Sequence, residues 1–232
     1  MRIEQSATFF TDVLARVRKG TLVAPAFQRP YVWSKQDVEA FWKSLLRGWP
    51  IGSVLIWSPK DARDLARGRI GPISVPADSS PSLILDGQNR LATFAWSLLT
   101  PGTPLVLPDG VDGRERDTWA SGESLVADPE TRSVRFVPTQ EASSGARVPP
   151  GLLIDTPALW KIVRQRGEAE FPDHLLKWLF EEAESSVRSA RVSVTEMVGG
   201  TLDEAIEAFL HVGRAGVPVS EDDLRAALAL KG

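Results

Sequence analysis

The sequence predicts an α+β fold, in which a sheet with flanking helices is followed by a mainly helical C-terminal part. Short aliphatic runs of strand length are interspersed with longer segments whose apolar residues recur at helical spacing. A stretch at about 101–150 is rich in Gly, Pro and Ser, and from about residue 156 the helical pattern dominates. A chain of 232 residues fits one large domain, so we expect a single domain over 1–232 with a loop-rich insertion at about 101–150.

The N-terminal elements are predicted from apolar spacing and capping residues. Residues 7–19 predict a helix with one apolar face, formed by Phe10, Val13, Leu14 and Val17. Residues 21–27 are expected to be extended. Ser34 is the predicted N-cap of the next helix, and Asp37 occupies the third helical position of a capping box. Gly48 is expected to end this helix, whose apolar stripe is Val38, Phe41, Trp42, Leu45 and Leu46.

Two strands of the sheet are expected at 51–57 and 82–85. The second strand leads into a helix that should pack through Leu91, Phe94, Ala95 and Leu98. Between the strands, residues 60–69 are rich in charge and predict a solvated helix or loop, with a DNA-facing patch as the alternative. We expect Trp42 and Trp49 to lie in the core.

The insertion contains one hairpin candidate, in which residues 125–127 and 134–137 pair across a turn at 128–131. Residues 141–150 predict a mobile loop. From Thr156 onward, helices are expected to pack through Leu159, Trp160, Val163, Leu175, Leu176, Leu179 and Phe180.

The C-terminal part continues with an alternating segment, 191–197, that predicts a strand with Val192 and Val194 on one side. Thr201 and Glu204 predict a capping box for a helix that faces inward through Leu202, Ile206 and Phe209. Ser220 is expected to cap a last helix.

The composition is that of an ordinary globular protein, with 43% hydrophobic and 25% charged residues. The absence of cysteine excludes disulfides and cysteine–zinc sites, and two histidines, His174 and His211, argue against a histidine-rich metal site. No signal peptide or membrane span is apparent, so a cytoplasmic location without membrane partners is expected. The net charge of −3 gives no general attraction to DNA, so any DNA contact would need a local patch.

The strongest functional signal is the segment 83–94, which predicts a buried strand that breaks at Asp86-Gly87 and restarts as a helix. Asp86, Gln88 and Arg90 lie at this break, beside a helix N-terminus whose free N–H groups favour anions. The alternative interpretation is structural: Asp86 caps the helix and Arg90 lies in solvent.

A second segment, 25–34, places Phe27, Tyr31 and Trp33 around Gln28 and Arg29. Aromatic anchors on both sides would fix the backbone of Arg29, and Pro30 restricts Arg29 to an extended conformation. An arginine held in this way can bind a phosphate with little further loss of freedom. The alternative is a core segment in which Arg29 pairs with a nearby carboxylate.

Together the two segments resemble domain-of-unknown-function family 262, the ParB/sulfiredoxin-like domain at the start of GmrSD-type modification-dependent restriction enzymes. The resemblance covers about residues 20–228. It is carried by six stretches of sequence: 27–33, Trp49-Pro50-Ile51-Gly52, Asp86-Gly87-Gln88-Asn89-Arg90-Leu91, 205–209, 216–220 and 223–224. It implies a ParB/sulfiredoxin-like mixed sheet core, and nucleotide binding and hydrolysis coupled to DNA restriction in anti-phage defence.

The chain departs from the family pattern at two positions. Asn89 stands where the family usually has a second glutamine. Gly213 replaces the asparagine of a family loop, here Gly213-Arg214-Ala215-Gly216. If that asparagine helps to hold nucleotide or metal, the protein would bind without turnover. These 232 residues contain no nuclease domain, so DNA cleavage would require a separate effector or nuclease protein, or a further part of this protein.

No Walker A pattern and no Gly-x-Ser-x-Gly element occur, which excludes a P-loop nucleotidase and argues against a serine hydrolase. We expect Arg29 and Arg90 to bind nucleotide phosphates, and Asp86 to hold Mg²⁺ or to position the attacking water. Gln88 would orient that water or recognise a base or ribose edge. Three further candidates for the nucleotide site are Gln28, Gly87 and Asn89.

Two functional hypotheses follow. The first is a nucleotide-binding, NTP-hydrolysing subunit of a prokaryotic DNA-restriction or anti-phage defence system. The second is a non-hydrolytic regulatory subunit that senses nucleotide or modified DNA and controls a partner nuclease. A DNA-binding adaptor without nucleotide is disfavoured by the acidic balance. A homo-oligomer is compatible with the sequence, which determines neither the oligomeric state nor the nucleotide base.

Overall fold

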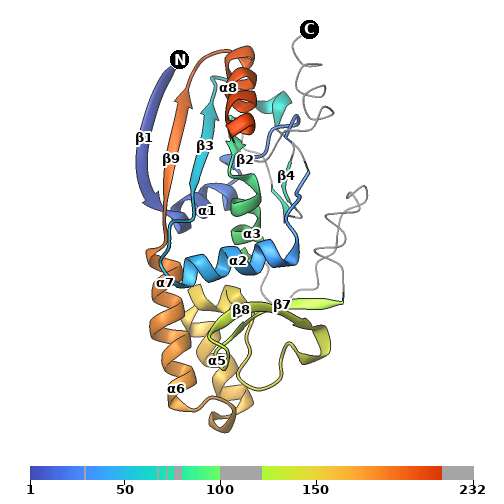
Figure 1. The fold of residues 1–232 in the computed structure, drawn as a ribbon, viewed down its shortest axis with the longest axis vertical. Coiled ribbons are helices and arrows are strands. Elements are labelled where there is room, and N and C mark those ends of the chain that lie inside the picture. The colour runs from blue at the N-terminus through green and yellow to red at the C-terminus, as the bar shows by residue number, and fades with distance from the viewer. Residues whose placement is uncertain (29, 67, 72, 76–79, 100–121, 216–232) are drawn as a thin grey trace.

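The computed structural model describes residues 1–28, 30–66, 68–71, 73–75, 80–99 and 122–215. A sheet with its helices forms one end of the elongated molecule, and a hairpin with a group of helices forms the other (Figure 1). Helices α2 and α3 lie between the two ends (Figure 1).

The main sheet has five strands in the order β1-β9-β3-β6-β2. Neighbours along this order alternate between antiparallel and parallel pairing, so the sheet is mixed. The strand bounds are β1 Arg2–Phe9, β2 Leu22–Val23, β3 Ser53–Ser58, β6 Ser82–Asp86 and β9 Arg191–Val198. The predicted α+β fold is confirmed, and so are the strands expected at 51–57, 82–85 and 191–197.

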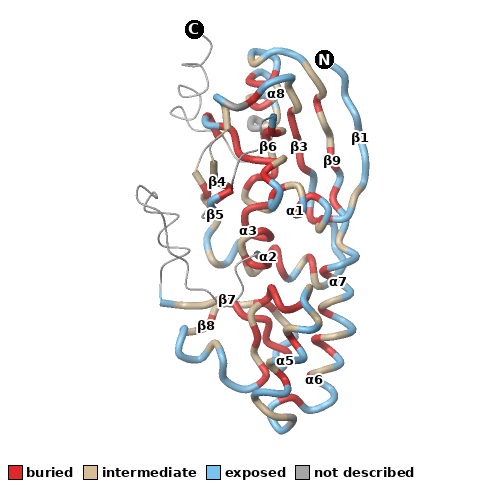
Figure 2. The backbone as a smooth tube through the Cα atoms, turned by 180° about the vertical axis from the view of Figure 1, so that it is seen from behind, coloured by how far each residue is buried: buried red, intermediate tan, exposed pale blue. Residues whose placement is uncertain are grey.

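The helices around the sheet are α1 Phe10–Arg18, α2 Lys35–Leu46, α3 Gln88–Leu99 and α8 Leu202–Ala215. All four residues predicted to form the apolar face of α1 are buried, and so are the four of α3. The prediction was wrong at residues 7–9, which belong to β1 and not to α1. Figure 2 shows β1 exposed along its length, so its sequence has no buried face to reveal it.

Both predicted capping boxes are present. Asp37 N–H donates to Ser34 Oγ, and Ser34 N–H donates to the Asp37 carboxylate at 2.8 Å. Thr201 and Glu204 make the same reciprocal pair at the start of α8, at 2.8 and 3.3 Å. Gly48 follows the end of α2 with a φ of +65°, as expected for a glycine that stops a helix.

Two buried hydrogen bonds join α3 to its surroundings, and a third lies within the helix. Tyr31 and Thr93 share one at 2.7 Å between their hydroxyls, and Trp42 Nε1 donates to Ser97 Oγ at 3.1 Å. The Ser97 hydroxyl in turn donates to the Thr93 carbonyl at 2.6 Å. Trp42 is therefore a core residue, as predicted. Trp49 is 51% exposed, so its predicted core position was wrong.

The other end of the molecule is built from β7 Glu123–Asp128 and β8 Ser133–Pro138, α5 Thr156–Arg166, α6 Asp173–Lys177, a π-helix Trp178–Ala183 and α7 Glu184–Ser189. The other elements of the described residues are short: β4 Arg69–Ile70, β5 Ile73–Ser74 and the 3-10 turns Arg63–Leu65, Thr139–Glu141, Pro150–Ile154 and Glu168–Glu170. Trp160, predicted to pack inward, is 42% exposed and stacks on Phe180.

The predicted hairpin is confirmed, and Asp128 at its turn is fully buried. The Asp128 carboxylate accepts hydrogen bonds from the Arg135 guanidinium at 2.6 Å, from Arg147 Nε at 3.0 Å and from two backbone N–H groups of the turn. Backbone bonds in both directions also join Ala127 and Val148. Residues 141–150, predicted to be a mobile loop, are thus bound to the hairpin.

In the described part of the chain, no helix is both long and apolar enough to cross a membrane. The helix expected after Ser220 lies outside the described residues.

Candidate functional site

The predicted strand–turn–helix element is present. β6 ends at Asp86, Gly87 has a φ of +88°, and α3 begins at Gln88. A Cβ on Gly87 would lie 3.0 Å from the carbonyl oxygen of Ser53 and 3.1 Å from Val54, both in β3. Glycine is needed here because β3 approaches so closely. We also expect Gly87 to let a phosphate approach the backbone, and this stays a prediction.

The Arg90 side chain lies across the chain that enters β3. Its guanidinium donates to Asp86 Oδ2 at 3.3 Å and to the Ile51 carbonyl at 3.4 Å. A Cβ on Gly52, whose φ is +90°, would be 1.8 Å from Arg90 Nη1, so only glycine leaves room for the guanidinium. We call Asp86, Arg90, Gly52 and the Ile51 carbonyl the Arg90 site.

The Arg90 site is open to solvent and its bonds are long. The side chains of Arg90 and Asp86 are 23% and 41% exposed. Hydrogen bonds of 3.3–3.4 Å are well beyond the common N–H···O length of about 2.9–3.0 Å, so the guanidinium is only loosely engaged. A stronger acceptor that comes from solvent, such as a phosphate oxygen, could take over these donors.

The structure brings the two predicted segments together. The buried Gln28 amide donates to the carbonyls of Ile84 and Leu85 in β6, at 3.1 and 3.2 Å, just before Asp86. Because β2 pairs with only the start of β6, Gln28 provides further bonds along this strand. These contacts give Gln28 a structural role, and its part in ligand binding stays a prediction.

The aromatic anchors expected around Arg29 are in place. Phe27 is buried against Phe209 of α8, with ring centroids 5.8 Å apart, and Tyr31 is buried with its hydroxyl on Thr93. Trp33 packs partly buried against the same core. Arg29 itself lies outside the described residues, so its convergence with Arg90 stays a prediction.

The other predicted residues have different surroundings. Gln88 is 6% exposed, and Asn89 is half-buried. His174 lies exposed on α6, and His211 is exposed on α8. Gly213 falls within the last turn of α8 and not in a loop, and the rest of the expected loop, from residue 216, lies outside the described residues.

A metal at Asp86 would have a single carboxylate ligand from this turn. Among the described residues, no group of three or more His, Cys, Asp or Glu side chains could hold a metal ion. Such a site fits Mg²⁺, which commonly takes one or two carboxylates and completes its shell with phosphate oxygens and water.

The carboxylates with shifted pKa values lie elsewhere and stabilise the fold. Burial raises the pKa of Glu196, but hydrogen bonds from Arg16 and Ser58 outweigh it and leave the pKa below its usual value. This group joins α1 to β9, β3 and β6, because Arg16 also donates to Ser82. Such ion pairs within a fold shift pKa values without marking a reactive group.

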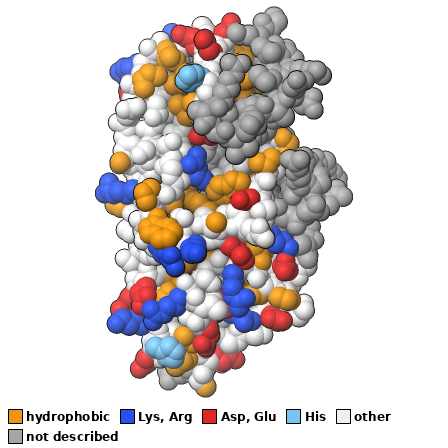
Figure 3. Space-filling view, viewed as in Figure 1, with side chains coloured by type: hydrophobic (Ala, Val, Ile, Leu, Met, Phe, Trp, Pro, Cys, Tyr) orange, Lys and Arg blue, Asp and Glu red, His pale blue; other side chains and the backbone are white. Residues whose placement is uncertain are grey.

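Sequence reasoning did not identify Gly52 or the Ile51 carbonyl as parts of the site. The available signal was the glycine at 52, just before a predicted strand, within the Trp49-Pro50-Ile51-Gly52 element. On the face shown in Figure 3, basic and hydrophobic side chains lie next to one another across the middle of the molecule, over α2 and the loop that follows it.

A family model described as "GmrSD restriction endonuclease, N-terminal domain" matches residues 10–230 of this chain. The chain is also 30% identical over 112 residues to an uncharacterized protein of Methanocaldococcus jannaschii. That alignment covers 45% of this chain and 19% of the relative, so the chain corresponds to a small part of the relative's length.

Proposed function

The chain belongs to the family of GmrSD restriction endonuclease N-terminal domains, and from this premise we propose that it is the nucleotide-binding, NTP-hydrolysing component of a DNA-restriction or anti-phage defence system. We also propose that its sheet has the ParB/sulfiredoxin-like architecture. One observation carries the proposal. Arg90 is held at the start of α3 by long, replaceable bonds, beside an exposed carboxylate and above a glycine that makes room for it.

Phosphate binding would combine the guanidinium with the helix terminus. The first N–H groups of a helix lack partners within the helix and carry partial positive charge, which favours an anion. Arg90 lies in the first turn of α3, so its donors can act on the same anion. Arg29 would be the second cation, since its neighbour Gln28 contacts β6 just before Asp86.

Hydrolysis would require the carboxylate as well. Bound Mg²⁺ would neutralise charge on the phosphates and on the leaving group. Asp86 would hold that ion once a phosphate has drawn the guanidinium away from Oδ2. Gln88, at the first position of α3, would orient the attacking water through its amide.

The test is nucleotide binding and phosphate release by the 232-residue chain with GTP, ATP, CTP and UTP in the presence of Mg²⁺. Arg90→Ala is expected to raise the Kd of the preferred nucleotide roughly 10- to 100-fold, because a charged hydrogen-bond donor is lost. Asp86→Ala is expected to abolish phosphate release. Arg188→Ala is the matched control, since Arg188 also pairs with a carboxylate four residues earlier, Glu184, and with an isoleucine carbonyl.

The outcomes separate the two candidate functions. The hydrolase is supported if the wild type and Arg188→Ala release phosphate while Asp86→Ala and Arg90→Ala do not. Binding without release supports the regulatory subunit, which the pairing of Asp86 with Arg90 and the glycine at 213 favour. Absence of nucleotide binding by the wild type contradicts the hydrolase and leaves only a regulatory subunit that senses modified DNA. In either function we propose that a separate nuclease cuts the DNA, and that DNA is contacted directly or through that partner.

A further inference from the structure

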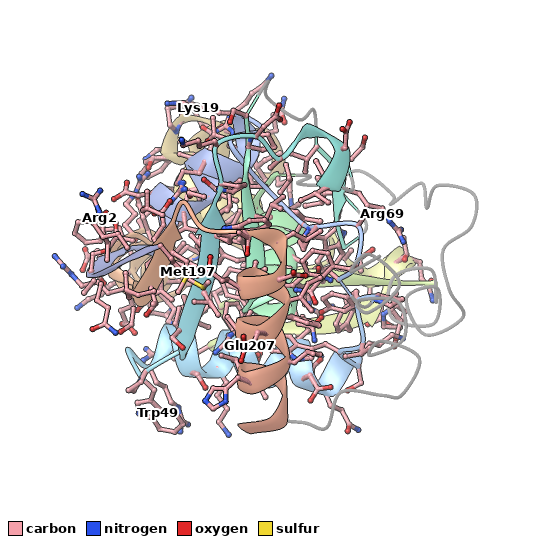
Figure 4. All side chains as sticks on the ribbon, turned by 90° about the horizontal axis from the view of Figure 1, so that it is seen from above. Arg2, Lys19, Trp49, Arg69, Met197 and Glu207 are labelled. Carbon is pink, nitrogen blue, oxygen red and sulfur yellow. The ribbon has the colours of Figure 1, made fainter. Side chains whose placement is uncertain are left out.

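Trp49 is exposed because of the way in which α2 ends. Gly48 N–H donates to the Leu45 carbonyl at 3.0 Å and Trp49 N–H donates to the Ser44 carbonyl at 2.9 Å, which is the Schellman pattern. In this motif the residue after the glycine commonly packs on the helix residue to which it bonds. That residue is Ser44, which offers little apolar surface, and Trp49 is 51% exposed. Figure 4 shows Trp49 projecting at the edge of the molecule.

The exposed ring is held in place on one side. The guanidinium of Arg47 lies 4.9 Å from the ring centroid of Trp49, a cation–π contact. Arg47 is the one stacking partner of this ring within the described part of the chain. The bond from Trp49 N–H to Ser44 holds the backbone and the stacking on Arg47 holds the indole, so little freedom would be lost when a flat ligand covers the ring.

The loop that carries Trp49 also forms the Arg90 site. Ile51, two residues after Trp49, provides the carbonyl that accepts from Arg90, and Gly52 leaves room for the guanidinium. Two residues span at most about 7 Å of chain, so the residue that carries the indole and the carbonyl that holds the guanidinium belong to one short loop. A ligand that fits both has an anion at one end and a flat aromatic group at the other.

We propose that Trp49 stacks on the base of the nucleoside triphosphate whose phosphates bind at the Arg90 site. This inference rests on the proposed function and adds to it the second half of the ligand. Stacking on an aromatic side chain accepts every base, so Trp49 would increase affinity for nucleotides without selecting strongly among them.

The experiment compares calorimetric titrations of GTP, ATP, CTP and UTP with titrations of inorganic tripolyphosphate, which has no base, all with Mg²⁺. Trp49→Ala is expected to raise the Kd of the nucleotides by roughly 5- to 150-fold, the range for one stacked base, and to leave the Kd of tripolyphosphate unchanged. Trp49→Phe should keep most of the affinity. Arg90→Ala should weaken both kinds of ligand.

Trp160→Ala is the matched control, because Trp160 is also exposed and already stacks on Phe180. In NMR spectra, the indole N–H resonance of Trp49 is identified by its loss in Trp49→Phe. This resonance is expected to shift when nucleotide is added and not when tripolyphosphate is added.

An unchanged nucleotide Kd in Trp49→Ala overturns the inference and leaves the proposed function intact. The inference also fails if Trp49→Ala loses affinity only for a single-stranded oligonucleotide. In that case Trp49 stacks on a base of DNA and not on the base of a nucleotide. If the wild type binds neither nucleotide nor tripolyphosphate, the proposed function fails and this inference fails with it.

Discussion

Replacing Gly52 with alanine is expected to weaken nucleotide binding about 10-fold, at the lower end of the range expected for loss of the Arg90 side chain, because Arg90 is displaced but retained. The new Cβ would occupy the place of Arg90 Nη1, 1.8 Å away, and the flexible guanidinium would have to leave the Ile51 carbonyl. A φ of +90° also strains any residue with a side chain, so the free energy of unfolding should fall by about 1–2 kcal/mol. Calorimetric titration and urea unfolding measure the two effects.

Gly145→Ala separates strain from displacement. Gly145 also has a positive φ, +58°, but a Cβ there would meet nothing within 4 Å. This variant should lose some stability through backbone strain alone and should bind nucleotide as the wild type does. If Gly52→Ala binds nucleotide normally, the guanidinium position seen here is not the one that binds phosphate.

Replacing Asp128 with alanine is expected to lower the free energy of unfolding by about 2–4 kcal/mol. The variant would leave two guanidiniums and two backbone N–H groups of the hairpin turn without their shared acceptor. The loss should stay below that of a fully buried ion pair, because Arg135 and Arg147 are 34% and 24% exposed and can regain water. Urea unfolding at neutral pH measures it. Asp155→Ala, which removes a cap that binds one N–H of α5, should cost only about 1 kcal/mol.

The contribution of Asp128 to the free energy of unfolding should decrease as the pH falls. Burial raises the pKa of Asp128, but hydrogen bonds from Arg135 and Arg147 outweigh it, and the pKa lies below its usual value. A carboxyl whose pKa is lower in the folded state stabilises the fold above its unfolded pKa, about 3.9, and loses this effect as the pH falls through the folded value. The difference between wild type and Asp128→Ala should therefore be constant above about pH 5 and shrink below about pH 4. A difference that grows on acidification contradicts this account.

Elements with a buried face could be predicted from the sequence, since burial imposes a period. The faces of α1 and α3, and the boxes at Ser34 and Thr201, all depend on neighbours within a few residues. β1 was missed because it is an edge strand with nearly every side chain exposed, so it has no apolar period. Its conformation is set by pairing with β9, some 190 residues later in the chain.

In the candidate site too, local features could be predicted from the sequence and features that depend on distant segments could not. Asp86 and Arg90 are four residues apart across a strand–helix junction, so their closeness could be predicted locally, whereas the ion pair between them was not predicted. The role of Gly52 could not, because it depends on β3 lying beside β6 in the sheet. Trp49 continues the apolar spacing of α2, but Gly48 ends the helix one residue earlier and directs the indole outward.

The three buried bonds on α3 have a consequence for the accuracy of the site. A helix packed through apolar side chains alone can roll about its axis at little energetic cost, because such contacts have no strong directional preference. The hydroxyls of Thr93 and Ser97 meet Tyr31 and Trp42 with directional bonds, which admit one angular setting of the helix. Arg90 lies one turn before Thr93, so the point and direction at which its side chain leaves the helix are set from inside the molecule before any ligand arrives.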